Sequence, residues 1–294
     1  MAGKGRTLSS SWLKRKVSTW LKYLSILYPR GVDDLEAETR NTLLKNLVLA
    51  RYPQIEENKT SDFDRVSFLR QWAARATNWS NKEGLLDRPG TTNPYARGFS
   101  FYSQDAPTIY AAFMRDKGGV WCSGTAYALV RLYELFGYKA FRIGIGVPNS
   151  DATHVVTVVE IEYEPGGRKI LSAQDAYFDL TYVHADGRPM DYFELLDLLR
   201  AHRDGDVAVA GSSTPMKRDL LYFANGYVKK VQGLYSLEDF KEQFRTELNS
   251  FYKEQGLPQD ILYMHLSVFS VRDLHKAERK EFISKLLARH VWKA

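Results

Sequence analysis

Cys122, the only cysteine in the chain, lies where a glycine-rich turn runs into an apolar helix, in the segment GGVWCSG at residues 118–124. The unpaired N–H groups and the positive dipole end at a helix start lower the pKa of a thiol. Because the thiolate is the reactive form, this placement favours a nucleophile. The plain alternative is an inert buried cysteine that packs like a small apolar residue.

Two candidate strands downstream of this helix carry the other groups that a thiol nucleophile needs. His154 opens an apolar run at 154–159, and Asp175 lies in the segment 172–178. A histidine can take the thiol proton, and a carboxylate can orient the ring and stabilise its charged form. His154 could instead be a hydrogen-bonded core histidine, and Asp175 a turn cap. Asp179, four residues further on, competes with Asp175 for the orienting position.

Three further features bear on the same chemistry. The backbone N–H groups at the start of the Cys122 helix would stabilise an oxyanion, which favours acyl transfer through a thioester. Trp121 either shapes an acyl pocket or packs beneath the loop. Gln174 either donates a hydrogen bond near the three side chains or is solvated at a strand end.

Helices are expected on the N-terminal side of this region. Apolar residues at helical spacing predict a basic amphipathic helix at 11–28, which packs against the domain or touches an anionic membrane surface. Further helices are predicted at 36–51 and from Ser61 onward. Glycines and prolines then predict a long loop at 78–102.

The elements around the three candidate residues follow from local signals. Asp105-Ala106-Pro107 predicts a helix start, the next helix runs from Cys122 to about Phe136, and Gly137 ends it. Branched and aromatic runs then predict strands, of which the last two form an antiparallel hairpin. These strands are expected at 139–147, 154–163 and 168–174, and later helices at 192–202, from Ser236 and at 277–293.

Four of these segments resemble the transglutaminase-like superfamily of papain-like thiol enzymes. GVWCSGTA at 119–126 and LYELFGYKAFR at 132–142 look like its cysteine motif with the following helix and strand. HVVTVVE at 154–160 and DAYF at 175–178 are similar to its histidine strand and its aspartate segment. The resemblance spans roughly residues 63–182.

The resemblance implies a role for each residue and a fold. Cys122 would be the nucleophile, His154 the general base and acid, and Asp175 the partner that orients the histidine. The expected fold is α+β, with a papain-like or transglutaminase-like core in which the Cys122 helix packs on an antiparallel sheet. We expect one domain over residues 1–294, divided into a helical extension (1–60), a catalytic core (61–185) and a mainly helical C-terminal part (186–294).

Composition narrows the class of protein. With 44% hydrophobic and 26% charged residues in 294, the chain reads as an ordinary globular protein. One cysteine excludes an intramolecular disulfide framework and a cysteine-rich zinc site, and no HExxH-type spacing or dinucleotide fingerprint is present, so no metal or cofactor is expected. We find neither a signal-peptide core nor a run of transmembrane length, and expect a cytoplasmic location.

The net charge of the chain indicates which classes of binding partner it favours. The formal net charge of +6 would favour an acidic protein partner or a phosphate-bearing substrate. The 41 Lys and Arg are spread along the chain without a zinc-finger or RNP-type motif, which argues against nucleic acid.

Two functions follow from these observations. The first is a cysteine-dependent acyltransferase, amidohydrolase or protease that takes an acyl group from a peptide amide or a carrier-protein thioester and passes it to an amine or to water. The alternative is a catalytically silent transglutaminase-like domain that binds a peptide, a glycan or a partner protein.

Overall fold

The computed structural model describes residues 35–77, 101–116, 120, 122–146, 153–163, 167–201, 203–211, 265 and 267–289. The predicted helices at 11–28 and from Ser236, most of the predicted loop at 78–102, and Trp121 lie outside these residues.

The described chain has an α+β fold with an antiparallel six-stranded sheet in the order β5-β4-β3-β2-β1-β6. The α-helices are α2 (Ala37–Arg51), α3 (Asp62–Ala76), α4 (Ala106–Asp116), α5 (Cys122–Leu135), α6 (Tyr192–Arg200) and α9 (Lys276–Arg289). The strands are β1 (Ala140–Gly146), β2 (Thr153–Glu162), β3 (Lys169–Asp175), β4 (Leu180–His184), β5 (Val207–Gly211) and β6 (Ser267–Arg272). None of the described helices has the length and apolar character that crossing a membrane requires.

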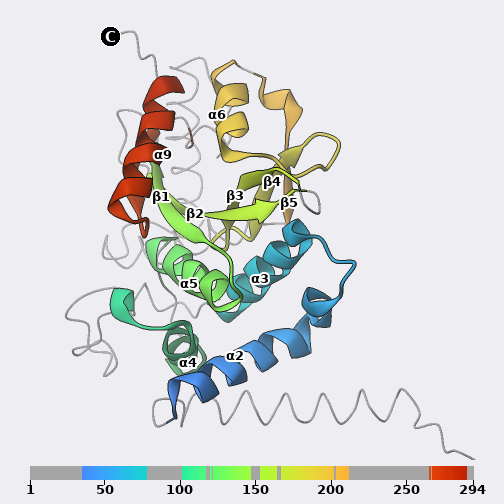
Figure 1. Cartoon of the computed structure of the whole chain (residues 1–294), viewed down its shortest axis with the longest axis vertical. Helices are drawn as coiled ribbons and strands as arrows, with labels where there is room; N and C mark the ends of the chain where they lie inside the picture. Colours follow the sequence, from blue (N-terminus) through green and yellow to red (C-terminus); the bar gives the residue numbers. More distant parts are fainter. Residues whose placement is uncertain are drawn as a thin grey trace, which may run out of the picture.

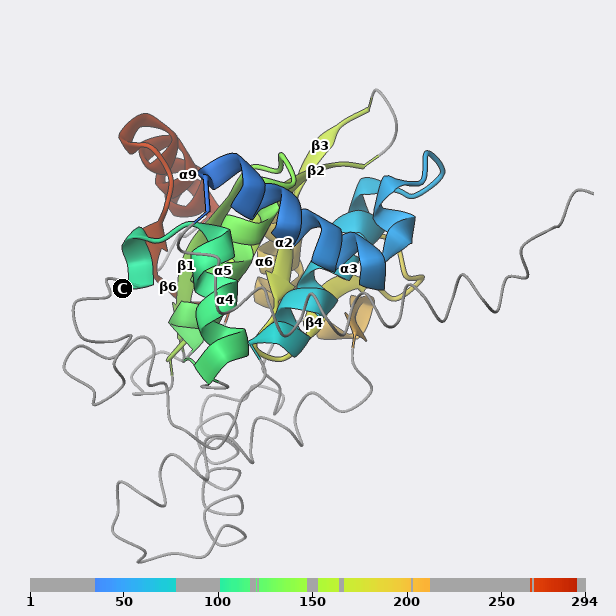
Figure 2. The ribbon, with the colours of Figure 1, turned by 90° about the horizontal axis from the view of Figure 1, so that it is seen from below.

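Helices cover both faces of the sheet. In Figure 1, α5 and α3 lie below the sheet with α4 and α2 beneath them, and α6 and α9 lie on the opposite side. Figure 2 shows from below that α4 and α5 lie close together beside α3. Each face of the sheet therefore has its own apolar core, called here the first core (toward α2 to α5) and the second core (toward α6 and α9).

The side chains of β2 point alternately to the two faces of the sheet, so this strand contributes to both cores. Val159 and Ile161 belong to the first core, whereas Val156 and Val158 belong to the second. Successive side chains of a strand point to opposite faces, so His154 has the parity of the second core.

Several local predictions are confirmed. The side chain of Ser61 accepts a hydrogen bond from the N–H of Asp64 at the start of α3, and Asp105 accepts one from the N–H of Thr108 at the start of α4. Gly137 has φ +86°, the left-handed conformation that ends a helix, just after α5. The hairpin of β2 and β3 is present and antiparallel.

Three strands were missed by the local reading of the sequence. β4 continues from β3, whereas β5 and β6 lie within 186–294, the part expected to be mainly helical, and β6 pairs with β1. Each of the three has only five or six residues. A strand this short carries little local signal, because its stability comes from the neighbours against which it pairs.

Candidate active site

Cys122 is the first residue of α5, as the sequence predicted. Its side chain is partly exposed and packs against the second core. The hydroxyl of Thr157 in β2 donates to the backbone oxygen of Ala126 at 3.0 Å, which ties the first turns of α5 to the sheet. The thiol therefore lies at the positive end of a helix that is held against the strand carrying His154.

His154 and Asp175 meet at one end of the β2–β3 hairpin. The antiparallel register pairs Thr157 with Gln174, which brings the start of β2 close to the end of β3. Nε2 of His154 lies 2.6 Å from Oδ2 of Asp175, and both side chains are almost fully buried. Residues 21 apart in sequence thus form a short, desolvated hydrogen bond on the second-core face of the sheet.

The second oxygen of Asp175 holds the turn that follows β3. Oδ1 accepts the backbone N–H groups of Tyr177 at 2.9 Å and of Phe178 at 3.0 Å. Asp175 therefore both caps a turn and contacts the histidine, two functions that the sequence presented as alternatives. With three hydrogen bonds on two oxygens, the carboxylate has a fixed orientation.

The surroundings of His154 favour its charged form. Burial acts to lower the pKa of His154, but the charge and hydrogen bond of Asp175, and to a lesser extent Cys122, outweigh it and raise the pKa to about 10. Phe178 packs edge-on to the imidazole at 4.6 Å between ring centroids, and the ring of Tyr177 lies at 5.6 Å. The ring is thus fixed by one carboxylate and two aromatic side chains.

The second ring nitrogen of His154, Nδ1, bears on whether Cys122 is a nucleophile. Nδ1 is buried and makes no hydrogen bond of normal geometry within the described residues. Cys122 nevertheless acts on His154 by a hydrogen-bond and a charge interaction that both raise the pKa of the histidine. Catalytic hydrogen bonds are often long or poorly aligned without substrate, and Nδ1 is the nitrogen that Asp175 leaves available for the thiol proton.

Asp179 does not contact His154. Its Oδ1 pairs with Nη1 of Arg70 at 2.5 Å, and the Arg70 side chain is 1% exposed. Between the two aspartates that the sequence offered, the structure places Asp175 against the histidine.

Gln174 is fully buried, on the opposite face of β3 from Asp175. Its amide nitrogen donates to Ser172 at 2.9 Å and to Thr181 at 3.0 Å, and its amide oxygen accepts from Nε of Arg70 at 3.0 Å. The side chain is neither solvated nor directed at His154, so its place is in a polar network beneath the site.

Two buried arginines near the site were missed by the sequence reading. Besides Arg70, Arg142 in β1 binds both oxygens of Asp273 at 2.6 and 2.9 Å and donates to the hydroxyl of Ser123 at 3.4 Å. Its guanidinium also lies over the ring of Tyr127 at 4.8 Å. Both arginines could have been found from one signal in the sequence, a single arginine in an otherwise apolar strand or on the apolar face of a helix. A charge buried there requires a partner.

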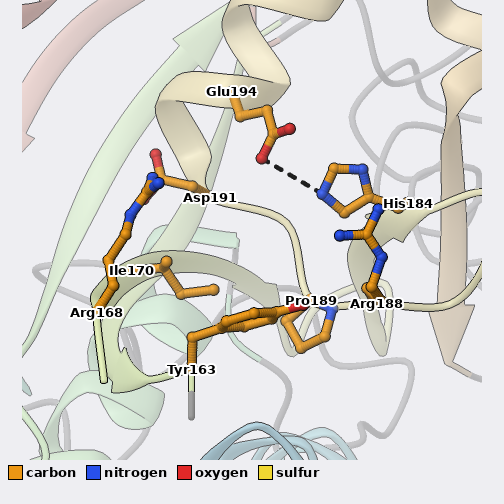
Figure 3. Close-up of a pocket in the computed structure, with 8 residues that line it drawn as sticks. All are labelled: Tyr163, Arg168, Ile170, His184, Arg188, Pro189, Asp191 and Glu194. Carbon is orange, nitrogen blue, oxygen red and sulfur yellow. Dashed lines mark ion pairs between the residues drawn. The ribbon is translucent and has the colours of Figure 1, made fainter. Parts of the chain in front are cut away.

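A hollow of about 240 Å³ lies away from these residues, at the far end of the β2–β3 hairpin, and Figure 3 shows its lining. In Figure 3, Nε2 of His184 faces Glu194 at 3.3 Å. Arg188 pairs at 2.6 Å with Asp186, which lies outside the lining. These charges compensate one another and none belongs to the Cys122 site, so the hollow indicates no ligand class.

Within the described part of the chain, no three His, Cys, Asp or Glu side chains are grouped so as to hold a metal ion. Comparisons with protein-family models, with curated proteins and with solved structures give no match to this chain.

Proposed function

We propose that this protein is a thiol-dependent acyl-transfer enzyme with a transglutaminase-like core, in which Cys122 forms an acyl-enzyme. The observation that carries the proposal is the buried 2.6 Å contact between His154 and Asp175 on the strands against which α5 packs. A base oriented by a carboxylate next to a thiol at a helix start is the arrangement that thiol nucleophiles require.

In the first step, His154 already holds the proton of Cys122 as an imidazolium, and Sγ attacks the carbonyl carbon of the donor as a thiolate. Backbone N–H groups at the start of α5 stabilise the oxyanion. As the intermediate collapses, the bond from carbon to the leaving nitrogen or sulfur breaks, and His154 returns the proton to that leaving group. The product is a thioester on Cys122.

In the second step, an amine or a water molecule attacks the thioester carbon, and His154 takes a proton from this acceptor. The carbon–sulfur bond breaks, the acceptor keeps the acyl group, and the proton stays on His154, which restores the thiolate and imidazolium. Asp175 stabilises the imidazolium in both steps and stays ionised. An amine acceptor gives an amide, and water gives hydrolysis of an amide or peptide.

The net charge of +6 favours an acidic donor. A carrier-protein thioester fits this charge, and a peptide amide is the other donor class that the same chemistry accepts.

The rate of alkylation of Cys122 by iodoacetamide, followed against pH, tests the proposal. Because Cys122 is the only thiol, modification is read directly from intact mass. We expect Cys122 to be alkylated at pH 7 much faster than a free cysteine, and to slow toward the rate of a free cysteine in His154→Ala. His184→Ala, which alters a partly buried histidine paired with Glu194, is the control and should leave the profile unchanged.

Alkylation of Cys122 at the rate of a free cysteine, unchanged in His154→Ala, would contradict an activated nucleophile and would favour the binding-domain alternative. Capture of an acyl adduct on Cys122 from a cell lysate, absent in Cys122→Ser, would identify the donor by its mass.

A further inference from the structure

We propose that Arg70 is a positioning residue for the His154–Asp175 pair, acting through Gln174 and Asp179. This inference rests on the proposed function, since it assigns a role in the same site to a residue that touches neither the thiol nor the histidine.

Arg70 joins α3 to both ends of the turn that follows β3. Its Nε donates to the side-chain oxygen of Gln174 at 3.0 Å, and its Nη1 donates to Oδ1 of Asp179 at 2.5 Å. These partners lie 104 and 109 residues away in sequence, and the guanidinium is buried. Gln174 directly precedes Asp175, and Asp179 directly precedes β4.

The turn needs such a restraint because its backbone is strained at the end. Asp179 has φ +54°, a left-handed conformation that side chains rarely adopt and that Asp holds most readily when its surroundings support it. The planar fork of an arginine, bound at two sites, supplies a direction as well as a charge.

Strand β5 also restricts Asp179. The backbone of Gly211, at the end of β5, lies so close that a Cβ there would stand 2.1 Å from the carbonyl oxygen of Asp179. Arg70 thus holds the Asp179 side chain while β5 confines its main chain. The end of the turn has little freedom left.

Fixing the turn fixes the carboxylate. Oδ1 of Asp175 accepts N–H groups from within this turn, at Tyr177 and Phe178, so a shift of the turn changes the direction in which Oδ2 meets His154. The rings of Tyr177 and Phe178 also line His154. The Arg70 guanidinium, on the opposite face of β3, therefore orients both Asp175, the partner of His154, and the aromatic rings that line His154.

The simpler reading is that Arg70 and Asp179 form only a stabilising buried ion pair. Under that reading, changing Arg70 lowers the free energy of unfolding but leaves the pH profile of Cys122 unchanged in molecules that are still folded. A positioning residue changes the profile itself. The two readings therefore differ in a measurable way.

The experiment compares Arg70→Met and Arg70→Lys with Val66→Ala, all in the full chain and at a temperature where circular dichroism shows each variant folded. Val66 lies on the same helix and is fully buried, so its truncation destabilises the protein without touching Gln174 or Asp179. For Arg70→Met we expect iodoacetamide alkylation of Cys122 at pH 7 to slow about tenfold. Arg70→Lys should give a smaller change in the same direction, and Val66→Ala none.

Asp179→Asn serves as a second, milder variant if Arg70→Met does not fold. Asparagine tolerates positive φ and still accepts from Arg70, so the fold should persist while the charge is lost. We expect alkylation of Cys122 at pH 7 to slow by less than in Arg70→Met. Profiles of Arg70→Lys and Asp179→Asn identical to that of the unmodified chain would overturn the positioning role alone. Alkylation of the unmodified chain no faster than that of a free cysteine would instead overturn the proposed function.

Discussion

His154 and His265 are two buried histidines in the same part of the molecule whose surroundings differ in one respect. His154 is 1% exposed and His265 is 0% exposed. His154 has the carboxylate of Asp175 at 2.6 Å, whereas His265 lies against the rings of Tyr182 and Tyr192, at 4.7 and 5.6 Å between centroids. Within the described residues, neither ring nitrogen of His265 has a hydrogen-bond partner.

This difference decides which histidine is charged. Burial, with a smaller contribution from the charge of His154, lowers the pKa of His265 to about 3. Burial acts on His154 in the same direction, but Asp175 reverses the outcome and raises the pKa to about 10. A histidine in this core can therefore hold a proton only where a carboxylate faces it, which supports the proposed role of His154 as the base.

Removal of the Asp175 carboxylate should have the largest effect on the alkylation rate of Cys122. In Asp175→Asn, the environment of His154 comes to resemble that of His265, its pKa falls, and the imidazolium no longer stabilises the thiolate. We expect alkylation of Cys122 at pH 7 to slow roughly a hundredfold, toward the rate of a free cysteine. The pH-dependent alkylation rate measures this.

Asp186→Asn is the control for that substitution. Asp186 is exposed and pairs with Arg188, far from Cys122 in the fold, so the same chemical change there should leave the rate unchanged. Equal rates in Asp175→Asn and the unmodified chain would show that the carboxylate does not control the thiol.

The free energy of unfolding at acid pH should reveal His265, the buried histidine that no carboxylate of the described residues faces. The pKa of His265 is about 3 in the folded protein, below the value of about 6.5 expected when unfolded, so below pH 6.5 the unfolded state binds the proton first. The contribution of His265 to the free energy of unfolding therefore falls as pH falls through this window, by about 2 kcal/mol between pH 7 and pH 5. Urea unfolding at both pH values measures the loss.

His265→Phe should remove this part of the acid sensitivity, because phenylalanine keeps the contacts with the tyrosine rings and does not titrate. His275→Phe, at an exposed position, is the control and should retain the full loss. If His265→Phe loses as much stability on acidification as the unmodified chain, His265 is not the neutral buried group described here.

The smallest effect is expected at Arg142, a buried cation that already has its carboxylate. Arg142→Lys keeps the charge beside Asp273 but loses the two-pronged geometry and the contact with Ser123. We expect a loss of about 1 to 2 kcal/mol in the free energy of unfolding, measured in urea. Alkylation of Cys122 should change by less than about threefold, since Arg142 contacts neither His154 nor Asp175. A larger change in rate than in Arg70→Lys would move the main positioning role from Arg70 to Arg142.

Much of the site could be predicted from local sequence. The glycine turn before an apolar helix indicated that Cys122 would begin α5, and the turn residues between two branched runs indicated the hairpin that carries His154 and Asp175. Such signals act over a few residues, through capping, dihedral preference and side-chain alternation. They could not distinguish Asp175 from Asp179, because Asp175 ends β3 and Asp179 follows it within one turn.

The sequence by itself determined which groups could do thiol chemistry and the order of the elements that carry them. Only the tertiary structure decided which aspartate meets His154, that Gln174 belongs to a network on the other face of β3, and that Arg70 reaches that network from α3. It also added β5 and β6 to the sheet from segments with little local strand signal. The reason is physical: a buried charge or a short strand is stabilised by partners far away along the chain, and that pairing is decided only when the cores close around it.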